Sequence, residues 1–126
     1  MEERDAKIEG KLNIEDSNRN IFIGDNAGVM NSSGELNTFI GLDAGIINTS
    51  GSQNTLFGTW TGTKLESGFA NTFIGAQAGA VNNGLYNTFL GHSAGLRNTG
   101  SLNTFLGNDA GANSNFGFLN VFIGNE

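Results

Sequence analysis

The chain has 126 residues, of which 12 are acidic and six are basic, so its formal net charge is -6. This charge argues against nucleic acid or an anionic membrane surface as a partner, because both attract clustered Lys and Arg side chains. No segment reaches the ~20 apolar residues of a membrane span, and the start lacks the basic and apolar segments of a Sec signal. The absence of Cys excludes disulfides and thiolate metal sites.

Charge divides the chain near Asn20. Ten of the 18 charged residues (12 acidic plus six basic) lie within residues 1–19. In this segment Ile8, Leu12 and Ile14 alternate with polar residues, which favours an extended strand-like conformation over a helix. We therefore expect a charged, extended leader over residues 1–19 and a nearly uncharged array over residues 20–126.

The array repeats one phrase of the type Asn-Thr-Phe-Ile-Gly seven times, at intervals of 16 or 17 residues. The phrase begins at Asn20, Asn37, Asn54, Asn71, Asn87, Asn103 and Asn120. A regular period of this length is typical of a chain that stacks one short unit on itself. With 20 Gly, ten Phe and no Pro, the composition suits short strands. The sequence thus predicts one all-β domain, a parallel β-solenoid with 16–17-residue coils.

Each coil is expected to begin with a strand such as residues 37–40, ended by a Gly with positive φ. The small pair that follows, such as residues 44–45, would allow a close backbone approach or a narrow corner. A second short strand, for example residues 29–30 or 46–47, should then lead into an Asn and a polar Gly turn. With coils ~4.8 Å apart, the Asn residues that begin them should form an amide ladder.

The strand phrase carries apolar residues on both faces. Successive side chains of a strand point to opposite sides, so Phe39 and Ile40 cannot both enter the coil interior. One face should line the core and the other a subunit interface, and the pattern does not decide which is which. One row comprises Phe22, Phe39, Phe73, Phe89, Phe105 and Phe122; the other comprises Ile23, Ile40, Phe57, Ile74, Leu90, Leu106 and Ile123.

The phrase N-T-F-I-G-x-x-A-G-x-x-N resembles the repeats of bacterial surface and phage tail-fibre proteins. It is similar, less closely, to the S-x-A-I-G repeats in the heads of trimeric autotransporter adhesins. The resemblance covers residues 20–126 and implies a left-handed β-roll that forms a homotrimer. It also implies attachment, with neighbouring fibre segments and a cell-surface glycan or protein receptor as partners. The leader, and the lack of a signal, anchor and coiled-coil stalk, favour a phage or injection-system fibre over a cell-surface adhesin.

Residues with catalytic or metal-binding chemistry are few. His92 is the one histidine, and no pair of a nucleophile and a general base can be assembled around it. Asp25, Asp43 and Asp109 fall in one inter-strand turn without the offsets of a calcium roll, so we interpret them as solvated turn residues. We expect no enzymatic activity, no cofactor and no bound metal.

The third coil departs most from the others and is the candidate recognition surface. Trp60 stands where other coils carry Asn26, Asp43 or Asp109. An exposed aromatic ring there would stack on a sugar or anchor a protein contact. The alternative is that the ring folds back onto the side of the rod or an adjacent subunit. The candidate set comprises Trp60, Thr59, Thr61, Lys64, Tyr86 and His92.

A second functional class is ice or crystal-surface binding. One threonine per coil would form a regular row, consisting of Thr38, Thr55, Thr72, Thr88 and Thr104. These residues share a strand face with the Ile/Leu row. Ice binding therefore requires a monomer in which this face is exposed.

Overall fold

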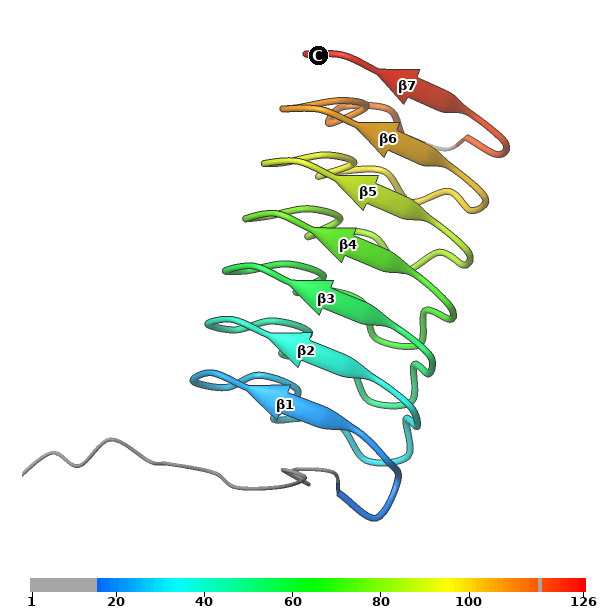
Figure 1. The fold of residues 1–126 in the computed structure, drawn as a ribbon. Helices are drawn as coiled ribbons and strands as arrows, with labels where there is room; N and C mark the ends of the chain where they lie inside the picture. Colours follow the sequence, from blue (N-terminus) through cyan, green and yellow to red (C-terminus); the bar gives the residue numbers. More distant parts are fainter. Residues whose placement is uncertain (1–15, 116) are drawn as a thin grey trace, which may run out of the picture.

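The computed structural model describes residues 16–115 and 117–126, which form a β-solenoid of about six turns (Figure 1). Seven three-residue strands stack in chain order into one parallel sheet. They are β1 Ile21–Ile23, β2 Thr38–Ile40, β3 Thr55–Phe57, β4 Thr72–Ile74, β5 Thr88–Leu90, β6 Thr104–Leu106 and β7 Val121–Ile123. The predicted all-β parallel solenoid is confirmed, and no helix occurs in the described residues. The expected leader lies outside them as far as residue 15.

The strand register places equivalent residues directly above one another. Phe39 of β2 pairs with Phe22 of β1 and with Leu56 of β3. The register holds although the period alternates between 16 and 17 residues, since β4 and β5 still pair Phe73 with Phe89. The extra residue must therefore be taken up outside the strands.

The polar turn absorbs this difference in length. In a 16-residue coil the Gly84 N–H donates to Asn82 Oδ1 at 2.8 Å. In the 17-residue coils that begin at residues 20 and 37, the glycine comes one residue later. There the buried Oδ1 atoms of Asn31 and Asn48 have no hydrogen-bond partner among the described residues. The longer turn thus leaves one buried acceptor unsatisfied, a cost that shorter coils avoid.

The expected second strand is wrong. Residues 29–30 form consecutive turns, in which the Val29 N–H donates to the Asn26 carbonyl at 3.2 Å. Contacts to the next coil also occur here, as where the Gly28 N–H donates to Ala44 O at 3.0 Å. Local bonds of this kind close tight turns, so this side of the coil cannot extend as a strand despite its apolar residues.

The core is a column of phenylalanine rings. Phe73, Phe89 and Phe105 are fully buried. The ring centroids of Phe73 and Phe89 are 4.8 Å apart with planes 5° from parallel, and Phe89 stacks on Phe105 in the same way at 4.8 Å. Leu56 takes the ring position in the third coil and is also fully buried. One inward side chain per strand therefore fills the whole interior.

Glycines allow the coil to close around this column. Gly45 has φ +58°, and a Cβ there would lie 2.5 Å from Phe39 Cε2, so the small pair fits a corner over a ring rather than against another backbone. Gly41 ends β2 with φ +137°, as predicted, and a Cβ there would lie 2.4 Å from the Gly58 carbonyl oxygen. A side chain at either position would force apart the stacked coils or the ring below.

Candidate recognition surfaces

The structure decides which strand face is the core. Phe39 and its equivalents point inward, whereas the Ile/Leu row points outward: the exposed fraction is 37% for Ile74, 43% for Leu90 and 56% for Phe57. In the third coil the order of residues is reversed, with Leu56 buried and Phe57 exposed. The strand alternation is therefore kept there, and the larger side chain lies outside.

The outward strand face is apolar and uncharged. Thr55, Thr88 and Thr104 are exposed on it beside the Ile/Leu row, and Thr38 and Thr72 are partly exposed. No outward position of the seven strands carries an acidic or basic residue. Figure 1 shows the strands stacked with this face continuous along the rod. We call this surface the outward strand face, formed by the threonine row and the Ile/Leu row.

The predicted amide ladder runs beside the core. Asn71 Oδ1 accepts the Asn87 N–H at 2.9 Å and Asn87 Nδ2 at 3.1 Å. Asn71 Nδ2 donates to the Gly84 carbonyl at 2.8 Å and to Asn54 Oδ1 at 3.1 Å. The ladder residues are buried from Asn20 to Asn103. Each asparagine therefore closes its own coil and links it to both neighbours.

Trp60 is half exposed and attached to the preceding coil. Its exposed fraction is 47%, and its Nε1 donates to Asp43 Oδ2 at 3.1 Å. Asp43 also accepts a bond from Asn26 Nδ2 at 2.9 Å, so three coils are joined at this turn. The Trp60 backbone has φ +56°, a left-handed conformation that is unfavourable for a bulky residue. The ring lies along the side of the rod but keeps much of its surface open.

The other candidates do not form one site with Trp60. Thr61 is fully buried, with its Oγ1 donating to the Ala78 carbonyl at 3.0 Å, so its placement on a recognition surface is wrong. Thr59 is partly buried and Lys64 is exposed. Thr61 replaces the alanine of other coils, and its hydroxyl requires a partner inside the rod.

Tyr86 and His92 are both exposed and lie apart from Trp60 in their contacts. The Tyr86 ring packs edge-on against Phe69 at 5.6 Å, and His92 Nδ1 lies 3.2 Å from Ser93 Oγ. Within residues 16–115 and 117–126, no hydrogen bond or aromatic contact joins either residue to Trp60.

The sequence did not reveal a second left-handed position, the residue before each ladder asparagine. Leu36, Tyr86 and Leu102 occupy it with φ of 59°, 57° and 62°. Leucine and tyrosine do not favour this conformation, so no local signal marks it. At the Trp60 turn position the Asn and Asp of other coils are such a signal, because both residues tolerate positive φ.

No protein-family model, curated protein or solved structure matches the chain. Its function must therefore be inferred from its own surfaces. Among the described residues, no three His, Asp or Glu side chains gather as a metal site. The same residues contain no helix long and apolar enough to cross a membrane.

Proposed function

We propose that the chain is a rigid segment of an attachment fibre that associates as a homotrimer through the outward strand face. The setting that fits is a phage or injection-system tail fibre, or a bacterial surface adhesin, where the segment spaces or presents a receptor-binding surface. The observation that carries the proposal is the uncharged apolar row, of which Ile74, Leu90 and Phe57 are 37–56% exposed. The proposal assigns no catalytic step and no cofactor.

The size of this face supports association. Fully burying an Ile, Leu or Phe side chain contributes ~1.5–3 kcal/mol, so completing the burial of a half-exposed one contributes roughly 1 kcal/mol. The row has one such residue in each of the seven strands, or roughly 7 kcal/mol per chain. Three chains would gain roughly 20 kcal/mol, against an ordering cost of ~4–15 kcal/mol for each association step. A closed trimer, which covers every face, uses this surface most completely.

The interior supports the role of a stiff spacer. The stacked rings of Phe73, Phe89 and Phe105 and the amide ladder both run along the axis. Such columns resist bending because a bend would separate ring pairs and stretch hydrogen bonds together. Trp60 and the exposed Lys64 are the residues through which this segment would contact a glycan or protein receptor.

Light scattering on the full chain tests the association. A trimer should have a mass near 40 kDa, since three chains of 13.2 kDa sum to that value. Leu90→Asp, on the outward strand face, should shift the mass towards the monomer because it places a charge in the interface. The matched control is Met30→Asp, since Met30 is similarly exposed (53%) but lies in a turn. A wild-type chain that remains monomeric at every concentration would refute the proposal.

A second candidate function is ice or crystal-surface binding. It is favoured by one observation: Thr55, Thr88 and Thr104 are exposed on the single chain and repeat at one strand spacing. If the chain is monomeric, it should inhibit ice recrystallisation, and Thr88→Lys should weaken this activity by disturbing the flat face. A monomer without any such inhibition would exclude this function.

A further inference from the structure

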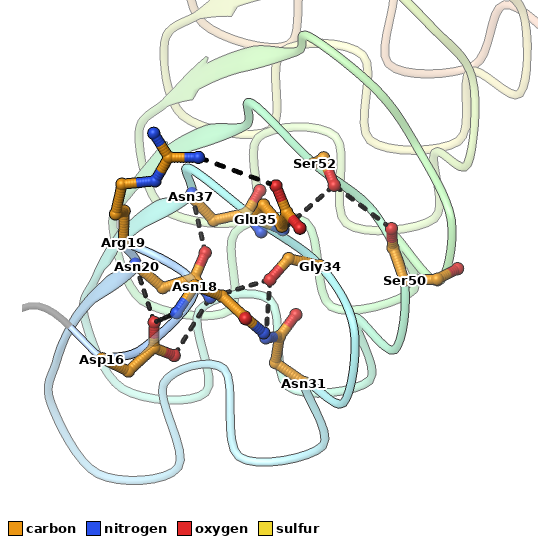
Figure 2. Close-up of polar contacts among 10 residues, drawn as sticks. All are labelled: Asp16, Asn18, Arg19, Asn20, Asn31, Gly34, Glu35, Asn37, Ser50 and Ser52. Carbon is orange, nitrogen blue, oxygen red and sulfur yellow. Dashed lines mark hydrogen bonds and ion pairs between the residues drawn. The ribbon is translucent and has the colours of Figure 1, made fainter.

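The N-terminal end of the rod is closed by one acidic side chain, Asp16 (Figure 2). Its Oδ1 accepts the backbone N–H of Asn20 at 2.9 Å, and its Oδ2 accepts Asn20 Nδ2 at 3.0 Å. The Asp16 backbone N–H donates to the Asn20 carbonyl at 3.1 Å. The Asn18 N–H also donates to Asp16 Oδ1, at 2.9 Å.

These bonds reproduce those that one coil makes to the next. Within the array the Asn37 N–H donates to Asn20 Oδ1 at 2.8 Å, as the Asn20 N–H does to Asp16. The Ile21 N–H donates to the Asn37 carbonyl at 2.8 Å, as the Asp16 N–H does to the Asn20 carbonyl. Asp16 therefore occupies the first ladder asparagine as a preceding coil would.

The ionised form of Asp16 is the one that makes this contact. Partial burial raises the pKa of Asp16, but the hydrogen bonds from the backbone and side chain of Asn20 and from Asn18 outweigh it. The pKa of the carboxyl group therefore lies below its ordinary value, because the carboxylate accepts every one of these bonds.

The C-terminal end of the described rod presents the opposite situation. Asn120 Oδ1 and the Val121 N–H have no hydrogen-bond partner among the described residues. Phe122 is 41% exposed, whereas Phe105, in the same position one coil below, is fully buried. Beside Phe122 lies a pocket of about 540 Å³, lined also by Gly111 and Ala112. In lower coils the small corner residues of the next coil lie over the ring at this place.

We propose that this C-terminal end is an interaction surface for another coil of the same Asn-Thr-Phe repeat pattern. We further infer that Asp16 prevents a second copy of this chain from being that partner. The partner must supply a free N–H from a ladder asparagine to Asn120 Oδ1 and a carbonyl to the Val121 N–H. In a second copy, the equivalent groups of Asn20 are already bonded to Asp16.

Continuity with the interfaces inside the molecule favours this occupant. Six in-register junctions already join neighbouring strands from β1 to β7, and the last of them stacks Phe105 on Phe122 at 4.9 Å. A coil added above β7 would repeat that junction and cover the exposed ring. The inference concerns the rod ends, so it applies to a monomer and to a laterally associated trimer alike.

Two variants of the full chain allow a directional test. Asp16→Ala removes the three carboxylate bonds and frees the Asn20 N–H. Val121→Pro removes the outward N–H of β7, at the first residue of an edge strand, where Pro is tolerated. The double variant therefore has an open N-terminal end and a blocked C-terminal end. The wild type has the reverse arrangement.

We expect the double variant to join the wild type end to end, giving one species with the sum of the two masses. Asp16→Ala alone should grow with concentration, because both of its ends are open. Ser17→Ala is the matched control and should keep the wild-type mass, as should Val121→Pro mixed with the wild type. Light scattering and analytical ultracentrifugation measure these masses, and circular dichroism verifies that each variant is folded. If folded Asp16→Ala and wild type have equal masses at all concentrations, and the mixed pair does not join, the inference is overturned.

This outcome is separable from failure of the proposed function. Lateral trimers appear in each protein measured alone and depend on Leu90. End-to-end joining appears only in the mixture or in Asp16→Ala, and depends on Val121.

Discussion

Replacing Asn71 by Ala should be among the most damaging single changes in the rod. The side chain is fully buried and makes four hydrogen bonds to three residues. Ala fits the space but leaves the Asn87 N–H without its acceptor and the Gly84 carbonyl without its donor. Both groups belong to buried backbone that water cannot reach.

The expected loss follows from these two groups. A buried polar group left without a partner costs ~1–3 kcal/mol, so Asn71→Ala should lower the free energy of unfolding by roughly 2–6 kcal/mol. Urea unfolding followed by circular dichroism measures the change. A loss below roughly 1 kcal/mol would refute the reasoning, because it would mean that the ladder bonds contribute little beyond those to water.

Asn71→Asp separates the acceptor role of the side chain from its donor role. One carboxylate oxygen can still accept the Asn87 N–H, but the other faces Gly84 O and Asn54 Oδ1, which are both acceptors. Burial and these oxygens should raise the pKa of the introduced carboxyl in the folded state. A raised folded-state pKa contributes stability that is present at low pH and lost as the pH rises through it. The variant should therefore approach wild-type stability in acid and fall behind it at neutral pH, and a pH-independent difference would contradict this assignment.

Three further predictions concern the core, the N-terminal end and the left-handed turn. Phe89→Ala should lower the free energy of unfolding by ~3–5 kcal/mol, whereas Leu90→Ala should cost the monomer roughly 1 kcal/mol; equal losses in denaturant unfolding would contradict the assignment of the two faces. The pKa of Asp16 is lowered in the folded state, so the stability it contributes is present above its unfolded pKa and lost as the pH falls through its folded value. Asp16→Ala should thus lower the melting temperature at pH 7 but not in strong acid. Trp60→Asn should raise stability by roughly 1 kcal/mol, because Asn tolerates positive φ, while any receptor binding through the ring is lost; an unchanged or lower melting temperature would mean that the bond to Asp43 outweighs the strain.

Much of the fold could be predicted from the spacing of the repeats. Stacked strands must sit one strand spacing apart with equivalent residues in register, so the period alone located all seven strands. The core face could not be predicted, because Phe39 and Ile40 alternate symmetrically and either could point inward. The false second strand arose because apolar residues such as Val29 were given more weight than the turns that local hydrogen bonds create. At the candidate site, Trp60 was recognised by its departure from the pattern, whereas the burial of Thr61 depends on a hydroxyl contact to the next coil that no sequence pattern shows.

The leucine at position 56 divides the aromatic column into unequal blocks. Phe22 and Phe39 stack at 5.0 Å below it, and the rings from Phe73 to Phe122 stack above it. In a one-dimensional array each coil is held only by its neighbours, so cooperativity is weakest where a neighbour contact is weakest. Under tension along the axis, we expect the rod to break first at its third coil. It would then behave as two springs in series rather than as one, with the two-ring block as the first to unravel.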